Sequence, residues 1–565
     1  MMKRMLSLLL ALCLVAGLVP TVFAGQLDNG LVYEIVDDHV EITGYNGSVT
    51  EVVIPSEIEG LPVTVIGNAA FRWCTTLTNI TLPDTLTTIN SGAFRGCTAL
   101  TSITLPDALT MIGTEAFSNC SALTSIVIPE GVTALFYYTF NECDSLTSIS
   151  IPASMSDLDV LAFINCDSLA EILIDSGNEY YCFQDGMLYT KDMTTLLWCT
   201  PATEGAVVIP EGVTTLAENV FNACPYVTSI SLPASVTTID ISALTGNLNR
   251  LREYLVDSAN EVFCAVDGVL YTKDMTQLVR CPNNLGGHLV IPESVTSLAW
   301  RSFYRCKLTS VVLPSGLPAI GEVFTGCSIK RFEIPVSVTY VEYGCFYNSD
   351  RVQDVYYHGT QEQWEAIEFM ALNTQLTNAN IHFNSTMPDP NPFSDVPKGS
   401  WYEDPIVWAV DEGITNGLTT DTFGPTATCN RAQVVTFLWR AAGCPEPTSA
   451  ENPFVDVQAG SFYEKPVLWA VEKGITNGSD ATHFNPNGVC NRAQVVTFLY
   501  RAFESPAVST EGLPFTDVPA GSWFEAPIAW AVENGITNGL SATEFGPNES
   551  CNRAQVVTFL YRAYN

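Results

Sequence analysis

The sequence predicts a solenoid of parallel β-strands, one strand per coil with short helical turns, followed by an all-α domain of three repeats. Two observations support this fold class. Phenylalanines and cysteines recur every 23 residues from Phe71 to Cys166, and a Phe-x-Asp motif recurs every 61 residues after Phe393. A fixed period in the twenties is typical of stacked coils that bury their apolar edges only against neighbouring coils.

The stretch 100–122 represents one coil. Leu100, Ile103 and Leu105 alternate with small polar residues before Pro106, a pattern that predicts a β-strand. Equivalent strands are predicted at Val49–Pro55, Leu77–Pro83, Leu100–Pro106, Leu123–Pro129, Leu146–Pro152, Leu169–Asp175, Gly205–Pro210, Val227–Pro233, Leu251–Asp257, Gly287–Pro292, Leu308–Pro314, Ile329–Pro335 and Val352–His358.

The ends of the solenoid, and two interruptions within it, have their own patterns. Residues 25–60 begin with two alternating segments around Asp37-Asp38, which predict a hairpin that caps the first coil. Asp185-Gly186 and Asp267-Gly268 each begin an equivalent hairpin, expected to project from the edge of the stack. The amphipathic segment 361–367 predicts a short helix that closes the far end.

Eight cysteines share one repeat position, three residues after the phenylalanine. They are Cys74, Cys97, Cys120, Cys143, Cys166, Cys224, Cys306 and Cys327. Because a cysteine thiol packs as a small hydrophobic group, a position repeated in every coil predicts buried thiols. Cys182/Cys199 and Cys264/Cys281 each bracket a hairpin, which leaves open whether these pairs form disulfides in an oxidising compartment.

Residues 1–24 are predicted to be an export signal, because Lys3 and Arg4 precede an apolar run and Ala24 ends a small-residue cleavage site. No later apolar segment is long enough to span a bilayer. The 60 acidic residues against 24 basic ones, with a net charge of -36, argue against a nucleic-acid partner. No catalytic motif or metal-ligand spacing occurs, so no catalytic residue, metal ligand or cofactor is predicted.

A proline-rich linker, residues 384–392, separates the solenoid at 25–383 from the three C-terminal repeats, predicted at 393–445, 454–503 and 515–565. Each repeat predicts a first helix with a proline in its first turn and a second helix after Asn-Arg-Ala-Gln.

The Leu-x-x-Ile-x-Leu-Pro and Ala-Phe-x-x-Cys pattern of the solenoid resembles the BspA-type leucine-rich repeat of bacterial surface proteins. The C-terminal units resemble the surface-layer homology (SLH) repeat through Phe-x-Asp-Val, Trp-Ala-Val, Gly-Ile-Thr-Asn-Gly and Asn-Arg-Ala-Gln. The resemblance implies a leucine-rich-repeat solenoid followed by an all-α triple SLH domain. It also implies secretion to the surface of a Gram-positive-type bacterium. There, SLH repeats bind secondary cell-wall polysaccharides, often pyruvylated, without covalent attachment.

The function expected on this basis is non-enzymatic. The SLH repeats would anchor the chain to cell-wall polysaccharide, and the solenoid would display a surface for adhesion to an unidentified protein or glycan. Two alternatives remain open, a structural component of a surface layer and a surface hydrolase with an unrecognised site.

The glycan-binding candidates lie in the repeated motifs. The arginines sit in the first turn of a helix, where the dipole disfavours a cation. Each arginine either receives a ligand carboxylate beside free helix N–H groups or forms a surface ion pair. The glutamines either form a capping box with the preceding asparagines or contact the glycan. The glycines permit either close approach of a sugar or a positive φ. The full set is Arg431, Arg492, Arg553, Gln433, Gln494, Gln555, Gly417, Gly478 and Gly539.

Overall fold

A computed structural model describes residues 23–564, apart from 350, 390 and 449–451. The chain folds as two compact units, residues 1–283 and 284–565. Most of the predicted export signal lies outside the described residues, and β1 (Phe23–Gln26) begins at its last two residues. The described part of the chain contains no helix with the length and apolarity needed to cross a membrane.

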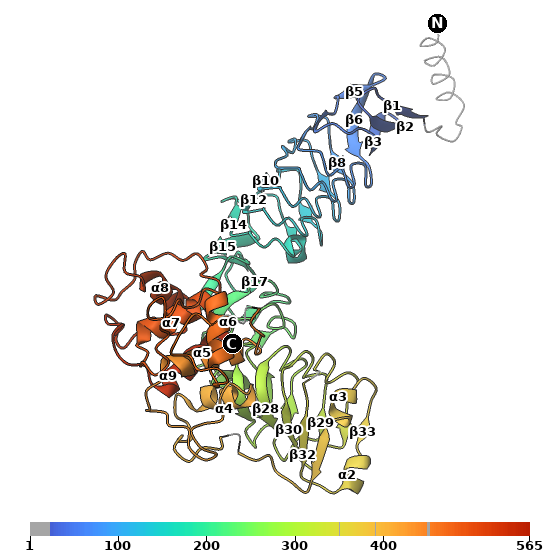
Figure 1. Cartoon of the computed structure of the whole chain (residues 1–565). Coiled ribbons are helices and arrows are strands. Elements are labelled where there is room, and N and C mark those ends of the chain that lie inside the picture. The colour runs from blue at the N-terminus through green and yellow to red at the C-terminus, as the bar shows by residue number, and fades with distance from the viewer. Residues whose placement is uncertain (1–22, 350, 390, 449–451, 565) are drawn as a thin grey trace. The chain divides into compact units, whose positions relative to one another are not determined.

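The first unit begins with an antiparallel meander of β1, β2 (Leu31–Val36) and β3 (His39–Tyr45), seen at the blue end of the chain in Figure 1. Strand β3 then pairs in parallel with β6 (Leu61–Ile66), which belongs to the first coil and also forms a short antiparallel pair with β5 (Glu57–Ile58). The meander therefore covers the edge that the first coil would otherwise leave unpaired.

The coils of the first unit stack through two parallel ladders. The predicted strand positions form the first ladder, which is paired in three separate segments: β4 (Glu51–Val53) with β7 (Asn79–Thr81), then β10 (Ser125–Val127), β12 (Ser148–Ile151) and β14 (Glu171–Ile174), then β18 (Glu204–Val208), β20 (Tyr226–Leu232) and β22 (Glu253–Val256). Two-residue strands form the second: β8 (Thr88–Ile89), β9 (Met111–Ile112), β11 (Ala134–Leu135), β13 (Asp157–Leu158), β19 (Thr215–Leu216) and β21 (Thr238–Ile239). The predicted parallel solenoid is confirmed, and most coils add a second short strand.

One predicted strand is wrong. Residues 100–106 keep the inward pattern, with Leu100 fully buried, but form no strand. Their backbone bonds to the two neighbouring coils are long, 3.4 Å from Thr101 N to Thr78 O and 3.3 Å from Thr124 N to Thr101 O. The buried side chains hold this coil in place although its backbone bonds to the neighbouring coils are too weak to form a strand ladder.

The repeated phenylalanines and cysteines line up inside the stack. Phe71, Phe94, Phe117, Phe140 and Phe163 are buried, and successive ring centroids lie 5.3, 5.3, 5.6 and 6.2 Å apart. Each cysteine thiol from Cys97 to Cys166 donates to the carbonyl of the phenylalanine one coil earlier, at 3.0–3.2 Å. The thiols therefore pack as the repeat position predicts.

Both Asp-Gly segments form hairpins that continue into a third strand. The first comprises β15 (Tyr181–Gln184), β16 (Met187–Thr190) and β17 (Thr195–Cys199), and the second comprises β23 (Phe263–Val266), β24 (Val269–Thr272) and β25 (Gln277–Arg280). The expectation that they project from the edge of the stack is wrong, because Leu188 and Leu270 are fully buried and β17 pairs in parallel with β19. Cys182 and Cys264 carry free thiols, so neither bracketing disulfide is formed.

The second unit begins with a sheet of five parallel strands: β26 (Gly286–Val290), β28 (Lys307–Val312), β30 (Arg331–Ile334), β32 (Asp354–Tyr357) and β34 (Asn380–Phe383). Short strands β29 (Ala319–Ile320), β31 (Tyr340–Val341) and β33 (Glu368–Phe369) form the second ladder, and β27 (Ser297–Leu298) precedes them. Helix α2 (Gln361–Glu365) begins with a capping box of Thr360 and Gln363, and α3 (Thr374–Thr377) follows it.

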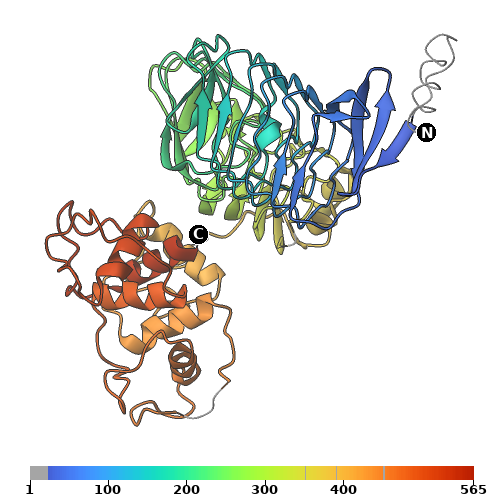
Figure 2. The same cartoon turned by 90° about the horizontal axis from the view of Figure 1, so that it is seen from above.

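The C-terminal part of this unit is helical, with two helices per repeat (Figure 2, orange to red). The first helices are α4 (Glu403–Asp411), α6 (Glu464–Glu472) and α8 (Glu525–Glu533), and the second helices are α5 (Arg431–Ala441), α7 (Arg492–Ala502) and α9 (Arg553–Tyr564). The predicted helix pairs are thus present in all three repeats.

Candidate functional site

The three C-terminal repeats close into a ring. Helix α5 of the first repeat packs on α6 of the second, α7 packs on α8 of the third, and α9 returns to pack on α4 of the first. The second helices α5, α7 and α9 also contact one another. Every repeat therefore completes its core with the following repeat, and the third completes its core with the first.

A ring of backbone hydrogen bonds runs through three equivalent cysteines at the centre of this assembly. Cys429 N donates to Cys551 O, Cys490 N to Cys429 O and Cys551 N to Cys490 O, at 3.0, 3.0 and 2.9 Å. All three side chains are fully buried, and burial raises the pKa of each thiol to about 12. The three cysteines thus mark the pseudo-threefold axis.

The start of each second helix is fully bonded within the protein. Gln433 N donates to Asn430 Oδ1 at 2.9 Å and Asn430 N donates to Gln433 Oε1 at 3.1 Å, which forms a capping box. Arg431 N donates to Gly488 O at 2.8 Å and Ala432 N to Pro486 O at 3.0 Å, both in the next repeat. The assumption that free helix N–H groups await a ligand carboxylate is therefore wrong, because the neighbouring repeat already accepts from them.

The arginine side chains also point into the next repeat. Arg431 Nε donates to Phe484 O at 2.8 Å and Nη2 donates to Thr476 Oγ1 at 3.3 Å. The guanidinium carbon lies 4.9 Å from the Phe484 ring centroid and 5.4 Å from that of Phe498. Only 7% of Arg431 is exposed, so the guanidinium lies within the protein and not in an open groove.

The other two junctions repeat this geometry. Arg492 donates to Phe545 O at 3.0 Å and to Thr537 Oγ1 at 3.4 Å. Arg553 donates to Phe423 O at 2.9 Å and to Thr415 Oγ1 at 3.4 Å, across 130 residues of sequence or more. Arg492 and Arg553 are each 3% exposed. Three arginines thus join three repeats, and the last one closes the ring.

An aspartate holds the loop that accepts the hydrogen bond of each arginine. Asp456 accepts from Phe484 N and Asn485 N, both at 2.8 Å, and its negative charge acts on Arg431. Burial lowers the pKa of Arg431, and the aspartate opposes that shift. The other two repeats place Asp395 and Asp517 in the equivalent position. The sequence prediction missed these aspartates and the threonines that the arginines bond, although both belong to repeated motifs, Phe-x-Asp and Gly-Ile-Thr-Asn-Gly.

The candidate glycines meet a packing requirement inside their own loops. Gly417 has a φ of +82°, and a Cβ on it would lie 2.5 Å from the Phe393 ring and 2.7 Å from two carbonyl oxygens. Gly478 and Gly539 show the same positive φ and the same contact with a phenylalanine ring. The loop conformation alone therefore accounts for glycine at these positions.

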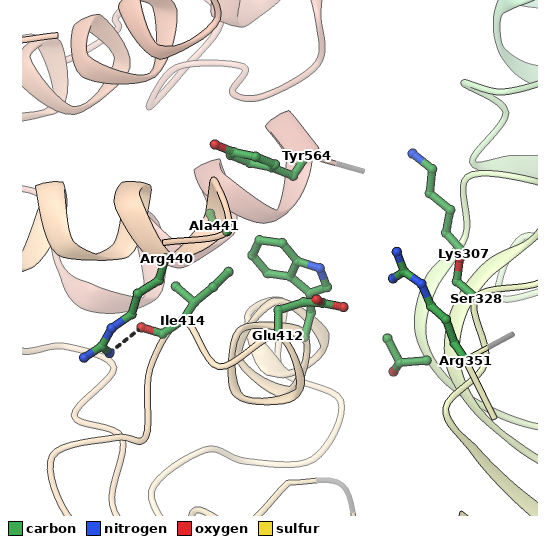
Figure 3. Close-up of a pocket in the computed structure, with 11 residues that line it drawn as sticks. Lys307, Ser328, Arg351, Glu412, Ile414, Arg440, Ala441 and Tyr564 are labelled. Carbon is green, nitrogen blue, oxygen red and sulfur yellow. Dashed lines mark hydrogen bonds between the residues drawn. The ribbon is translucent and has the colours of Figure 1, made fainter. Parts of the chain in front are cut away.

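The far end of each second helix carries another arginine. Figure 3 shows Arg440, whose Nη1 donates to Ile414 O at 2.8 Å. Arg501 and Arg562 make the same bond to Ile475 O and Ile536 O, each at 3.1 Å. These bonds hold the second helix against the loop of its own repeat.

The most exposed aromatic rings of the triplet are equivalent in the three repeats. Trp401, Phe462 and Trp523 are 59%, 61% and 56% exposed. Each ring meets the next aromatic residue edge to face, with centroids 5.0–5.1 Å apart and interplanar angles of 86–88°. The protein therefore presents three oriented aromatic surfaces to solvent. Within the described residues, no group of three or more His, Cys, Asp or Glu side chains is placed to hold a metal ion.

Comparison with known families identifies both parts of the chain. The model of the BspA type leucine rich repeat region matches in six copies, over residues 64–188, 202–261 and 284–398. The model of the S-layer homology domain matches residues 392–435, 453–496 and 514–557.

Curated relatives share the C-terminal repeats. An S-layer protein of Bacillus licheniformis is 31% identical over 171 residues, which are 30% of this chain and 19% of the relative. S-layer protein EA1 of Bacillus anthracis is 29% identical over 170 residues, 30% of this chain and 19% of the relative. Exoglucanase XynX of Acetivibrio thermocellus is 26% identical over 174 residues, 30% of this chain and 16% of the relative. The chain therefore spans about a fifth of the length of these relatives or less.

Solved structures resemble the solenoid. A leucine rich cell surface protein from Faecalibacterium prausnitzii is 24% identical and covers 62% of this chain and 99% of its own, with a TM-score of 0.39. A leucine-rich repeat protein from Eubacterium ventriosum is 22% identical and covers 58% of this chain and 95% of its own, with a TM-score of 0.41.

Proposed function

Because the chain belongs to the BspA type leucine rich repeat family and carries three S-layer homology domains, we propose that these domains hold it non-covalently on a secondary cell-wall polysaccharide. A chain with this domain content and these relatives is a cell-surface protein associated with the cell wall. The observation that carries the proposal is the match of three S-layer homology domains, together with the packing of the three repeats into one ring.

The ring gives the three repeats a physical use. With a net charge of -36 the chain gains no long-range attraction to an anionic polymer, and at physiological salt charges are screened beyond about 8 Å. One charge-assisted hydrogen bond contributes about 1.5–3 kcal/mol, too little for retention. Three rigidly held contact regions on one polymer raise the effective concentration of each further contact. Tight attachment then follows from weak individual contacts.

We divide the candidate residues by their surroundings. Arg431, Arg492 and Arg553 shape the junctions from within the protein, and the three glycines shape the neighbouring loops. Gln433, Gln494 and Gln555 are half-buried at the same helix starts, where an amide remains within reach of a sugar. The exposed rings of Trp401, Phe462 and Trp523 offer faces on which a sugar ring stacks.

Sedimentation with cell walls tests the attachment. Purified full-length chain should sediment with native walls, and removal of the secondary polysaccharide from the walls should leave it in the supernatant. Equal sedimentation with both kinds of wall would contradict the proposal. Changing all three glutamines to alanine should weaken retention, whereas changing them to glutamate preserves the capping box and serves as the control for stability.

We further propose that the solenoid displays a surface for adhesion, without catalysis by the chain itself. The alternative of a surface-layer component has support from the S-layer relatives, and purified chain that forms ordered two-dimensional arrays without any ligand would favour it. The alternative of a hydrolase has support from relatives such as the exoglucanase, and turnover of a glycan substrate by the purified chain would favour it.

A further inference from the structure

A cavity of about 250 Å³ opens on the turn side of the first unit, beside the first inserted hairpin. Its lining includes Asn165, Asp167, Asn222, Tyr226 and Asn247, with Pro201 among the remaining wall residues. All of these residues belong to the same compact unit.

The inserted hairpin explains why a cavity exists here. In the regular coils an Ala-Phe-x-x-Cys turn follows every 23 residues and covers the turn before it. After Phe163 the next aromatic ring in the stack is Trp198, 5.7 Å away at the end of β17, and a loop through Pro201 replaces the usual turn. Accordingly, the thiol of Cys224 donates to Cys199 O at 3.4 Å, whereas the thiols at the same position in the regular coils donate to a phenylalanine carbonyl. The stack therefore lacks the wall that closes this space elsewhere.

One side of the cavity is held by a close backbone approach. Asn247 N donates to Asn222 O at 3.0 Å. A Cβ on Gly246 would lie 2.2 Å from Phe221 O and 2.4 Å from the Cα of Asn222, so only glycine lets these two turns meet. The asparagines at this wall are thereby fixed next to each other.

The lining supplies polar groups that the fold does not use. The side chains of Asn222 and Asn247 make no hydrogen bond to the described part of the chain. Asn165 is oriented by a 3.2 Å hydrogen bond from its Nδ2 to Asn141 Oδ1. Tyr226 is 45% exposed, and Arg250 lies 5.1 Å from its ring centroid. Side-chain amides both donate and accept, a carboxylate accepts, and an aromatic face covers C–H groups.

We propose that this cavity binds one neutral saccharide unit. Adjacent ring hydroxyl groups match paired amide and carboxylate groups, the apolar face of the sugar matches Tyr226, and the volume admits one ring but not a folded peptide. Asp167, whose charge also acts on Asp144, disfavours an anionic ligand. The inference deepens the proposed display role by naming a ligand class for the solenoid, and it does not depend on wall attachment.

Calorimetric titration of the full-length chain, without walls, tests this site. The probes are glucose, galactose, N-acetylglucosamine and N-acetylgalactosamine, with N-acetylneuraminic acid as the anionic comparison. At least one neutral sugar should bind saturably with a Kd of about 1 mM. Binding should weaken about tenfold or more, which corresponds to roughly 1.4 kcal/mol, when Asn222→Ala and Asn247→Ala are combined.

Two further variants keep the result interpretable. Asn249→Ala, an exposed neighbour outside the lining, should bind like the unchanged chain, and Asp167→Asn, at an exposed position, should bind more weakly without a change in melting temperature. Absence of saturable binding by every neutral sugar, equal binding of the anionic sugar, or unchanged affinity in the double variant would overturn the proposal. Wall sedimentation of the double variant should match that of the unchanged chain, so a failure of attachment is distinguishable from a failure of this site.

Discussion

Arg431, Arg492 and Arg553 are charged side chains that the protein keeps almost entirely out of water. Desolvation of a cation costs several kcal/mol unless hydrogen bonds and favourable charges offset it. Here each guanidinium has a carbonyl, a threonine hydroxyl and two phenylalanine rings, with an aspartate nearby. Such a side chain stabilises the folded ring only while every one of these partners stays in place.

Arg431→Lys should therefore destabilise the triplet. Lysine keeps the charge but lacks the planar group that donates to Phe484 O and Thr476 Oγ1 while lying between two rings. We expect a loss of about 2–3 kcal/mol in the free energy of unfolding, measured by urea titration of the helical signal. Lys473→Gln, at an exposed position, is the control and should leave the midpoint unchanged. An equal midpoint for Arg431→Lys would contradict the structural role.

The buried thiols make stability depend on pH. In the folded triplet burial raises the pKa of Cys429, Cys490 and Cys551 to about 12, against 9.0 for an ordinary cysteine. Above pH 9 the unfolded chain releases protons that the folded chain keeps, so stability is full below pH 9 and falls as the pH rises towards 12. One pH unit above 9, each thiol should remove roughly 1.4 kcal/mol from the free energy of unfolding.

Urea titrations on both sides of pH 9 measure this loss. The variant with all three cysteines changed to alanine provides the comparison, because it has no thiol to ionise at these positions. Its midpoint should fall less steeply with pH than that of the unchanged chain. Identical slopes would show that these thiols do not ionise on unfolding.

Local sequence reasoning succeeded where the partner of a residue lies nearby. The capping box of Asn430 and Gln433 joins residues three positions apart, and the sequence contains both halves. The prediction of free helix N–H groups beside Arg431 was wrong, because the acceptors of Arg431 N and its guanidinium lie in the next repeat, 45–57 residues away. For Arg553 the equivalent acceptors lie 126–138 residues away. Only the closed ring reveals that the first N–H groups of α5, α7 and α9 already have acceptors in another repeat.

At the scale of elements, the aromatic column connects one coil to the next. Phe117 is fully buried with neighbouring ring centroids at 5.3 and 5.6 Å, and its carbonyl accepts from the thiol of Cys143. Because a solenoid coil contacts only its neighbours, a cavity in one coil weakens the contacts on both sides. The column is therefore the most sensitive part of the repeat.

Phe117→Ala should lower the free energy of unfolding by about 3–5 kcal/mol, since it removes a large side chain and leaves a cavity. Thermal and urea unfolding of the full chain, followed by the β-sheet signal, measure the loss. Phe136→Ala serves as the control because Phe136 is 38% exposed, and it should change the midpoint little. A near-neutral result for Phe117→Ala would contradict the coil register.

The sequence predicted the coils well and their second ladder not at all. The Phe-Cys period fixes which residues face inward, because side chains alone carry that pattern. Strands such as β8 and β9 contain two residues each, too few for an alternating pattern to be recognised. The third strand after each hairpin was missed for a related reason: β17 is placed by its parallel partner β19, which follows in the next coil.

At the scale of the whole molecule, the chain combines two repeat systems with different consequences for function. The solenoid adds similar coils in a series, so its ligand site arises where an inserted hairpin breaks the series. The SLH triplet closes on itself, so its three repeats present equivalent features together. The proposed attachment depends on that closure, because separated repeats would lose the gain from simultaneous contacts.

The most direct test of this account is calorimetric titration of the full chain with the secondary polysaccharide released from native walls. It is carried out at a temperature where the triplet of the unchanged chain is folded and that of Arg553→Lys is unfolded. We predict saturable binding by the unchanged chain and by Lys473→Gln, and none by Arg553→Lys. Absence of binding by the unchanged chain, or equal binding by Arg553→Lys with its triplet unfolded, would contradict an anchor formed by the closed ring.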